Sequence, residues 1–317
     1  MNTVKSTCII CPFCKGKSYE LTRIKANELV ELNENTLHVS NIANLFGDVQ
    51  YLAYCVCETC GLKYFNPLIT GDDNFYRQLE SNDWYYLHDD KIEYDFSKRY
   101  INENNKVLDV GAGRGAFAKR INCKCYQGID FSTKAIELAK KDGINVLAIP
   151  VQEHCIEKEE FYDVVVLFQI IEHIGENIEE FLISCVKCLK KGGRLIVAVP
   201  NNDGFIRNAT NAILNLPPHH VLHWQESSLR FLGKKYGLSV ETVYKEPVAH
   251  IHKGWWYATV TNAFIQKITF RKIKMVELRP TCLLYRLLKR ILSGCAKLLN
   301  LHKWGHGQSI IVVYRKV

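Results

Sequence analysis

Between residues 106 and 246, short apolar runs alternate with stretches in which apolar residues recur every three or four positions. Runs of the first kind predict buried strands, and stretches of the second kind predict amphipathic helices. Strands are expected over residues 106–110, 125–129, 145–149, 164–168 and 194–199, and from Leu238 onward. Helices are expected after the capping residue Ser132, over about 177–189 and over about 226–236. Lys191-Gly192-Gly193 is expected to terminate the second of these helices and to lead into the strand over 194–199. This alternation predicts an α/β fold built on a parallel sheet.

The first strand runs into three glycines at alternate positions, Gly111, Gly113 and Gly115. Glycine lets the backbone approach a ligand closely and adopt a positive φ angle. A helical pattern follows through Phe117 and Ile121. The segment therefore predicts a strand, a tight turn, and a helix whose N-terminus faces a ligand.

The first 66 residues contain two Cys-x-x-Cys pairs, formed by Cys11 with Cys14 and by Cys57 with Cys60. Four thiolates suit a tetrahedral zinc ion in a structural site, because no coordination position stays open for catalysis. The chain thus predicts a zinc-ribbon-like module over residues 1–66, with unligated thiols as the alternative.

Details of this module are less well defined by the sequence. Cys8 and Cys55 lie close enough in the chain to compete for the ligand assignment. The span between the two pairs alternates apolar and polar residues in places, as a small hairpin would, at Leu29, Leu32, Leu37 and Val39.

Residues 67–105 form a connector that is rich in Tyr, Asp and Asn, with short helices and one helix expected across 92–101. Its Trp84-Tyr85-Tyr86 run either packs between the neighbouring modules or forms one wall of a substrate pocket. Packing is the preferred interpretation, because aromatic side chains bury large apolar areas.

Positive charge is concentrated near the C-terminus. Of the net charge of +8, residues 250–317 carry +12, from thirteen Lys and Arg and the single acid Glu277, and residues 1–249 carry −4, from 28 bases and 32 acids. This asymmetry predicts an anionic partner such as a phosphate-bearing substrate, a membrane surface or nucleic acid.

Residues 248–304 interrupt the α/β pattern as a basic helical insertion, before a last strand over 309–314. An amphipathic helix is expected over 281–300. Its polar face is Arg286, Lys289, Arg290, Ser293, Lys297 and Asn300, and its apolar face is Leu284, Leu287, Leu288, Ile291, Cys295 and Leu298. We expect this insertion to be a lid that packs its apolar face over the substrate, and the alternative is a helix that lies on an anionic membrane.

Composition limits the class of protein. An apolar fraction of 47% and a charged fraction of 23% are typical of globular domains. No N-terminal apolar segment resembles a signal peptide, and no apolar run is long enough to span a bilayer. The thirteen scattered cysteines favour reduced thiols and metal ligands. These features predict a cytoplasmic protein, with the inner face of the membrane as the alternative location.

The order of these segments resembles the class I S-adenosylmethionine-dependent methyltransferase family. The resemblance covers about residues 106–246 and the last strand, and rests on residues 107–115, Gly128-Ile129-Asp130, and residues 161–166, 171–174 and 189–201. It implies a Rossmann-like sheet of seven strands, formed by residues 106–247 and 305–317. The segments Glu172-His173 and Pro217-Pro218-His219-His220 more narrowly resemble bacterial small-molecule methyltransferases related to the ubiquinone-pathway O-methyltransferases. Some of these carry an N-terminal zinc-binding module.

The resemblance implies roles for residues at the carboxyl ends of the strands. The glycine turn would approach the methionine part of S-adenosylmethionine, and Asp130 would accept hydrogen bonds from the ribose hydroxyls. The alternative for Asp130 is to start a helix without contacting a ligand. The acid that usually reads the adenine amine is missing after the third strand, and either Gln152 or a backbone group would take its place. Gln169 would line the floor near the reacting methyl. The implied cofactor-binding residues are Asp109, Gly111, Ala112, Gly113, Gly115, Asp130, Phe131, Gln152 and Gln169.

Methyl transfer to a hydroxyl is helped by a general base, and histidine is best matched to neutral pH. The candidates are His173, after the strand over 164–168, and His219 and His220, in the Pro-Pro-His-His loop. Each of them would otherwise be a structural histidine. Glu172 with His173 would alternatively hold a divalent cation, although two residues do not make a site.

The sequence therefore predicts O-methylation of a sugar, a glycan precursor or a secondary metabolite, with a phosphate-bearing or lipid-linked acceptor as one option. An RNA methyltransferase that binds through the zinc module and the basic segment is an alternative. Against it, the Asn/Asp-Pro-Pro-Tyr/Phe sequence of base-nitrogen methylation is absent after residue 168. A non-catalytic, zinc-bearing interaction protein is a further alternative, and the intact glycine turn counts against it. A nicotinamide-dependent enzyme would need the third glycine one residue later.

Overall fold

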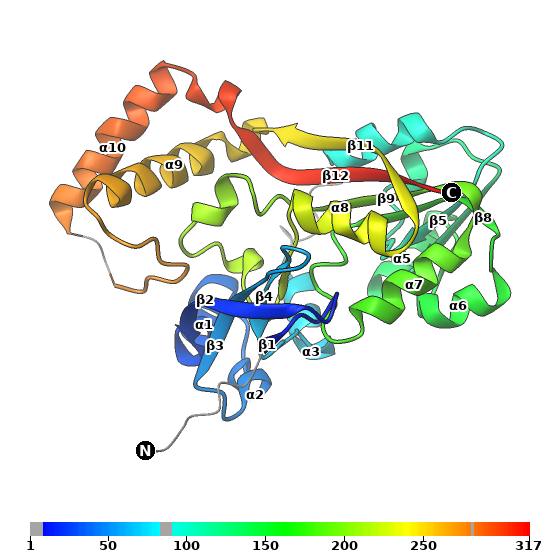
Figure 1. Cartoon of the computed structure of the whole chain (residues 1–317), viewed down its shortest axis with the longest axis horizontal. Helices are drawn as coiled ribbons and strands as arrows, with labels where there is room; N and C mark the ends of the chain where they lie inside the picture. The colour runs from blue at the N-terminus through cyan, green and yellow to red at the C-terminus, as the bar shows by residue number, and fades with distance from the viewer. Residues whose placement is uncertain (1–8, 83–90, 280–281) are drawn as a thin grey trace.

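A computed structural model describes residues 9–82, 91–279 and 282–317 of the chain (Figure 1). Its larger sheet has seven strands in the order β11-β12-β9-β8-β5-β6-β7. The strands are β5 (Lys106–Val110), β6 (Cys125–Ile129), β7 (Val146–Leu147), β8 (Tyr162–Phe168), β9 (Leu189–Pro200), β11 (Leu238–Pro247) and β12 (His306–Lys316). In this described sheet β12 alone runs antiparallel to its neighbours. The predicted seven-stranded α/β sheet is thereby confirmed.

The strand order reverses between β5 and β8, because the chain extends the sheet in one direction through β6 and β7 and in the other from β8. At such a reversal the carboxyl ends of the strands open a crevice for a ligand. β5 ends directly before the glycine turn, and β8 ends shortly before Glu172 and His173. The topology therefore places the glycine turn beside the segment that carries two candidate catalytic residues.

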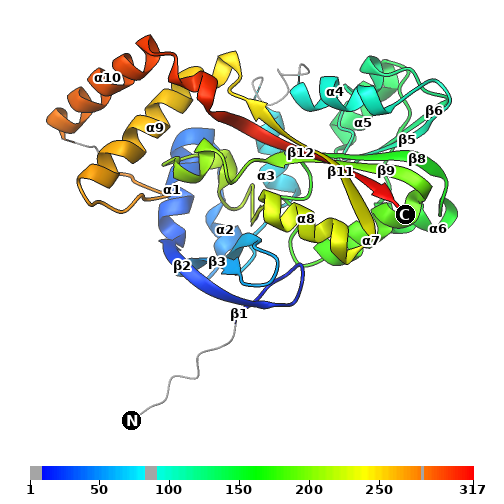
Figure 2. The same ribbon diagram turned by 45° about the horizontal axis from the view of Figure 1, so that its top comes forward.

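Helices cover both faces of the sheet (Figure 2). On one face Val165 and Leu167 pack with α7 (Ile178–Cys188) and α8 (Glu226–Lys235), and on the other Val164 and Val166 pack with α4 (Ile92–Ser97). Successive strand residues thus bury opposite sides, as expected for a sheet covered twice. The remaining helices of this core are α5 (Thr133–Lys141) and α6 (Val151–Glu157). The predicted cap of α5 is confirmed, because Ser132 Oγ accepts the Ala135 N–H at 3.2 Å.

The helix expected after the glycine turn is absent from the structure, which has only a three-residue 3-10 helix, Ala118–Arg120. Gly113 and Gly115 have φ angles of 53° and 75°, which do not belong to a right-handed helix. The apolar spacing instead serves ring packing, because Phe117 lies 4.9 Å from Phe168 between ring centroids.

Two further local expectations were wrong. The span expected to be a hairpin contains helix α1 (Ala26–Leu37), and Leu29, Leu32 and Leu37 are among its buried residues. Helix α7 ends at Cys188 and β9 begins at once, so Gly192 lies inside a strand. The register between β8 and β9 shifts at this point, and Gly192 has a φ angle of 76°. The Gly192-Gly193 pair therefore forms a strand irregularity in place of a loop between elements.

The smaller, N-terminal sheet has five described strands in the order β1-β2-β3-β4-β10. They are β1 (Ile9–Ile10), β2 (Lys17–Lys25), β3 (Tyr51–Cys57), β4 (Lys63–Asn66) and β10 (Leu222–His223), accompanied by α1 and α2 (Ala43–Phe46). Because β10 follows the Pro-Pro-His-His loop, that loop is tied to the N-terminal sheet.

The connector contains α3 (Asp73–Glu80) and then α4, which continues as a 3-10 helix over Lys98–Tyr100. The helix expected across residues 92–101 is confirmed. The Trp84-Tyr85-Tyr86 run lies outside the described residues.

A helical hairpin of α9 (Lys253–Ile268) and α10 (Leu283–Leu298) is inserted between β11 and β12 and projects from the sheet (Figure 1). α10 has no buried residue, and its predicted apolar face, which a lid would press onto a substrate, is open to solvent. Within the described residues we find no helix with both the length and the apolar composition needed to cross a membrane.

Candidate functional site

The glycine turn is held against the end of β6. The N–H groups of Gly111 and Ala112 both donate to the carbonyl of Ile129, at 2.8 and 3.1 Å. Gly111 has a φ angle of +77°, and a Cβ atom there would lie 2.1 Å from Cδ1 of Ile170. Both the backbone conformation and this close approach therefore require glycine at position 111.

Asp130 bridges the glycine turn and the start of α5. Its Oδ2 accepts the Gly113 N–H at 2.7 Å, and its Oδ1 accepts the Ser132 N–H at 2.8 Å. Burial raises the pKa of Asp130, and these backbone bonds oppose the shift. Each carboxylate oxygen keeps acceptor capacity, so the bonds leave room for ribose hydroxyls. The ribose role of Asp130 stays a prediction.

Asp109 lies almost fully buried near the end of β5, and its Oδ2 accepts the Tyr126 O–H at 2.8 Å. Burial raises the pKa of Asp109 to about 7, the hydrogen bond from Tyr126 lowers it, and the charge of Asp130 adds to the rise. A cation bound here would favour the charged carboxylate. The arrangement therefore suits an ammonium group.

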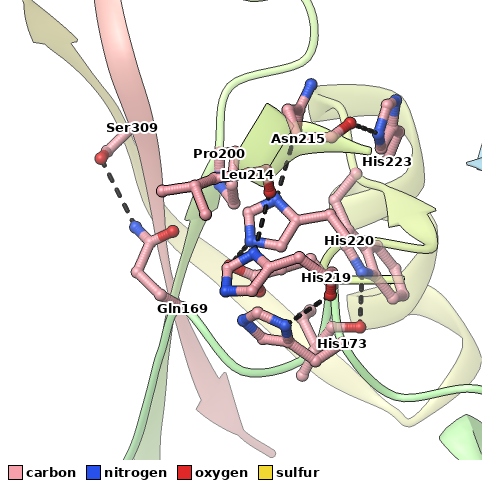
Figure 3. Close-up of polar contacts among 12 residues, drawn as sticks. Gln169, His173, Pro200, Leu214, Asn215, His219, His220, His223 and Ser309 are labelled. Carbon is pink, nitrogen blue, oxygen red and sulfur yellow. Dashed lines mark hydrogen bonds and ion pairs between the residues drawn. The ribbon is translucent and has the colours of Figure 1, made fainter. Parts of the chain in front are cut away.

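Gln169 follows β8 with a φ angle of 56°. Its Nε2 donates to Glu93 Oε1 at 3.3 Å and to Ser309 Oγ at 3.5 Å, and the second contact is drawn in Figure 3. Gln169 thus joins the end of β8 to α4 and β12. Sequence reasoning missed Glu93, which belongs to no recognisable motif and is brought here by the packing of α4.

Phe131 and Gln152 are less clearly placed. Phe131 exposes 74% of its surface, and Gln152 is half-buried in the first turn of α6. Among the described residues no side-chain hydrogen bond ties Phe131 or Gln152 to the glycine turn, so their cofactor roles stay predictions.

The three candidate histidines meet in one cluster, which is shown in Figure 3. The ring centroid of His173 lies 4.6 Å from that of His219 and 4.6 Å from that of His220. The centroids of His219 and His220 lie 4.5 Å apart. One ring nitrogen of each histidine lies within 4.8 Å of those of the other two. The structure thus brings together side chains that lie in two separate loops of the sequence.

Hydrogen bonds orient these imidazoles. Nδ1 of His173 lies 2.7 Å from the carbonyl oxygen of His219, and Nδ1 of His219 lies 2.9 Å from that of Leu214. Nδ1 of His220 lies 3.3 Å from Oδ1 of Asn215. A neutral ring that donates from Nδ1 presents its lone pair at Nε2. Burial lowers the pKa of all three histidines, to about 4 for His173, so the rings are neutral near pH 7.

Glu172 is completely buried beside this cluster, with Oε1 at 4.0 Å from Nε2 of His220. Neither of its carboxylate oxygens has a hydrogen-bond partner among the described residues, and burial raises its pKa to about 8. Its carbonyl accepts the N–H groups of Val221 and Leu222 at 3.0 and 3.1 Å, which clamps the two histidine-bearing segments together. The three imidazoles and the Glu172 carboxyl together can take up a proton. They also offer more donor atoms to a cation than Glu172 and His173 alone.

Ile170 connects the glycine turn to the histidine cluster. Its side chain lies against Gly111, and its carbonyl accepts the His173 N–H at 3.0 Å. The predicted methyl-donor side and the predicted acceptor side are therefore neighbours at one edge of the sheet.

Neighbours that the sequence did not single out complete the cluster. Tyr76 O–H lies 3.2 Å from Nδ1 of His173. His223 contacts Tyr54 O–H through Nδ1 at 2.9 Å and Asn215 O through Nε2 at 2.8 Å. In the sequence, the feature that could have pointed to His223 is its position three residues beyond His220 in the same segment.

The four predicted metal-binding cysteines converge at the N-terminal sheet. Sγ atoms lie 3.7 Å apart in Cys11 and Cys60 and 3.3 Å apart in Cys14 and Cys57, and all four lie within 4.8 Å of one another. Zn–S bonds of about 2.3 Å in a tetrahedron place sulfur atoms about 3.8 Å apart, so the set fits zinc. Cys55 points elsewhere, with Sγ at 3.7 Å from Ala53 O, and Cys8 lies outside the described residues.

Comparison with known proteins gives a consistent family assignment. A family model described as a methyltransferase domain matches residues 82–243. The ubiquinone biosynthesis O-methyltransferase of Rickettsia prowazekii is 32% identical over 123 residues, which cover 35% of this chain and 48% of that enzyme. An uncharacterised protein of Methanocaldococcus jannaschii is 31% identical over 116 residues, covering 37% of this chain and 54% of that protein. The chain thus spans about half the length of these curated relatives.

Solved structures also align with most of the chain. A SAM-dependent methyltransferase from Archaeoglobus fulgidus aligns at 17% identity and a TM-score of 0.45, over 70% of this chain and 92% of that one. A putative methyltransferase from Bacillus halodurans aligns at 18% identity and a TM-score of 0.46, over 71% and 98%.

Gly111→Ala should weaken S-adenosylmethionine binding at least about tenfold, because the new Cβ displaces Ile170 and strains the turn. Gly192→Ala is the matched control, since its φ is +76° and no atom lies within 4 Å of the added Cβ. Isothermal titration of both folded variants measures the difference. Equal affinities would mean that the turn does not form the cofactor floor.

Asp109 should make the free energy of unfolding fall as the pH rises from about 4 to about 7. In this window the folded state keeps a proton, because burial raises the carboxyl pKa from 3.8 to about 7, and the unfolded chain has lost it. The stabilisation is complete below the unfolded pKa and disappears as the pH passes the folded one. Asp109→Asn should flatten the profile measured by urea unfolding, whereas Asp48→Asn, at an exposed residue, should not. An equally steep profile in Asp109→Asn would contradict the assignment.

Proposed function

The chain belongs to the methyltransferase domain family, and we propose that it transfers the methyl group of S-adenosylmethionine to a hydroxyl of a small molecule. The acceptor class is a sugar, a glycan precursor or a secondary metabolite. The observation that carries the proposal is the cluster of neutral imidazoles that Ile170 joins to the glycine turn. Oxygen as the acceptor atom is supported by relatives that are ubiquinone biosynthesis O-methyltransferases.

The cofactor side consists of the glycine turn with two carboxyls. When bound, S-adenosylmethionine supplies an electrophilic methyl group on a sulfonium, which leaves as a neutral thioether. Gly111 and Gly113 would let the backbone come close to the cofactor, Asp109 would balance its ammonium group, and Asp130 would accept hydrogen bonds from its ribose hydroxyls. The raised pKa of Asp109 supports this fit, because a cation would relieve the unfavourable burial of its charge. Hydrogen bonds from the ribose hydroxyls would likewise favour the charged form of Asp130, whose pKa burial raises.

On the acceptor side, transfer forms a C–O bond, breaks the S–C bond and releases the hydroxyl proton. Nε2 of His220 takes this proton in our proposal. We prefer His220 because Oε1 of Glu172 lies 4.0 Å from that nitrogen, where the ionised carboxylate would stabilise the imidazolium that forms. Burial raises the pKa of Glu172 to about 8, so the ionised form is the minor one near pH 7. The low pKa that burial causes keeps the ring neutral before the reaction. Alignment of donor and acceptor supplies much of the remaining acceleration.

His173 is the second candidate for the base, and His219 is the third. The Nδ1 contact of His173 with His219 O, at 2.7 Å, also lets it hold the Pro-Pro-His-His loop in position. Its role is therefore either to accept the proton or to position the ring that does.

A structural zinc ion at Cys11, Cys14, Cys57 and Cys60 completes the proposal. Its expected function is to support the Pro-Pro-His-His loop, because β10 directly follows that loop and belongs to the N-terminal sheet. Phe13, between the first two ligands, packs its ring 5.1 Å from Trp224, whose Nε1 donates to Ile171 O at 3.1 Å. The zinc module is thus linked through Trp224 to the segment that carries Glu172.

His220→Gln should lower kcat by roughly 100-fold, the usual contribution of a general base, and leave the Kd for S-adenosylmethionine unchanged. His173→Gln and His219→Gln complete the series. His154→Gln is the control, since His154 is a buried histidine bonded to Tyr162 O–H at 2.7 Å, at the opposite end of β8. Near-normal turnover in all three cluster variants would contradict a histidine base.

The acceptor class is tested with methyl-labelled S-adenosylmethionine and a panel of glycan precursors, quinone precursors and RNA. The proposal expects label on the oxygen of a small molecule. Label on RNA alone, with binding that falls steeply with salt, would overturn it.

Cys57→Ser should reduce the zinc content from about one ion per chain and lower the free energy of unfolding, because a ligand thiolate is lost. Cys55→Ser is the matched control, being a buried neighbour outside the cluster. Elemental analysis and urea unfolding check both. If the wild-type chain carries no zinc and the two variants are equally stable, the structural zinc is disproved.

A further inference from the structure

Helix α10 leaves an apolar stripe uncovered. Its other side faces the body of the protein, because Tyr285 O–H donates to Asn262 Oδ1 of α9 at 2.7 Å and Ala296 packs on the cluster that includes Trp256. Leu284, Leu287, Ile291 and Leu298 are 77%, 45%, 63% and 83% exposed. Residues three, four and seven positions apart lie on one side of a helix, so these four form a continuous stripe.

Further large apolar side chains of this region are exposed. Leu288 and Cys295 lie on the same stripe, and Trp304, just after the hairpin, is 89% exposed. We refer to Leu284, Leu287, Leu288, Ile291, Leu298 and Trp304 as the hairpin face. Contiguous exposed apolar surface of this kind marks a site of contact with a protein or a membrane.

The chain around the hairpin face carries a large excess of positive charge. Residues 253–304 contain eleven Lys and Arg and one acid, Glu277, a net charge of +10. Glu277 is itself paired with Lys274 at 2.7 Å. Within α10, Arg286, Arg290 and Lys297 are exposed and recur at helical spacing beside the apolar stripe. The partner must therefore offer both apolar and anionic surface.

We propose that the hairpin face docks on the surface of an anionic lipid bilayer. The apolar stripe enters the boundary between headgroups and acyl chains, and the flanking Arg and Lys side chains contact lipid phosphates. α10 has 16 residues and is about 24 Å long, so it lies along the surface. A second copy of the chain is a poorer partner because it brings another +10 to the contact, and nucleic acid would leave the leucines in water.

The hairpin is attached to the acceptor side of the fold. Trp256 and Tyr257 of α9 pack with Phe205 and Ile206, which follow β9 and precede the Pro-Pro-His-His loop. Docking of α10 would thus hold the segment that leads to the Pro-Pro-His-His loop near the bilayer. This last consequence rests on the proposed function, whereas the docking itself does not.

Co-sedimentation of the full chain with vesicles tests the proposal. The chain should bind vesicles of equal parts phosphatidylglycerol and phosphatidylcholine at low salt, bind phosphatidylcholine alone at least about tenfold more weakly, and be released by high salt. Trp304 emission should shift to shorter wavelength on binding, and Trp304→Phe should remove most of the shift.

Paired variants separate the two parts of the surface. Leu287→Ser with Ile291→Ser should weaken binding roughly tenfold or more, because two buried side chains are lost. Arg286→Gln, Arg290→Gln and Lys297→Gln together should weaken it about 100-fold. The controls are Ile156→Ser, at an apolar residue of α6 that is 78% exposed, and Lys140→Gln with Lys141→Gln on α5. Neither control should change binding.

No binding to anionic vesicles at low salt would overturn the proposal, as would binding that survives loss of Leu287 and Ile291. A dimer in light scattering that these two substitutions dissociate would assign the hairpin face to a second copy and also overturn it. RNA binding that depends on the three basic residues but not on the two apolar ones would do the same. Titration with S-adenosylmethionine should give wild-type affinity in every hairpin variant, so failure of docking and failure of the proposed function are distinguishable.

Discussion

The contact between Ile170 and Gly111 is the constraint on which the candidate site depends. Cδ1 of Ile170 occupies the space that a side chain at position 111 would fill, 2.1 Å from the place of its Cβ. The same residue accepts the His173 N–H through its carbonyl. Because the strand order reverses between β5 and β8, a ligand crevice is expected at this edge of the sheet. One residue thereby sets how closely the glycine turn approaches the histidine-bearing segment.

A second set of contacts holds the histidine-bearing loop against the segment that carries Glu172. The carbonyl of Glu172 accepts two N–H groups that follow His220, and the chain then enters β10 of the N-terminal sheet. The four-cysteine cluster lies in the same buried cluster of side chains as Trp224 and the interior of the large sheet. The N-terminal module is thus continuous with the core, and it bears directly on the loop that carries the imidazoles. In our account the metal would stabilise the acceptor side without taking part in the chemistry.

Much of the fold was predictable because its signals are local. Apolar runs mark the buried strands, and the spacing of Gly111, Gly113 and Gly115 marks the turn. A helix was wrongly expected through Phe117, because its apolar spacing serves aromatic packing. A connection was wrongly expected at Gly192, because glycines occur both in loops and at irregular positions in strands. The cysteine ligands were predictable from spacing, but the meeting of His173 with His219 and His220 depends on backbone bonds between distant segments. In α10 the sequence revealed an apolar stripe, but periodicity cannot tell whether another element covers it.

Thermal unfolding of the full chain with increasing S-adenosylmethionine tests the central claim most directly. A ligand that binds only the folded state at 100 times its Kd stabilises that state by about 2.7 kcal/mol. Our account predicts a rise in Tm that continues with ligand concentration. An unchanged Tm at millimolar S-adenosylmethionine would contradict it, and would favour an interaction protein that has kept a methyltransferase fold.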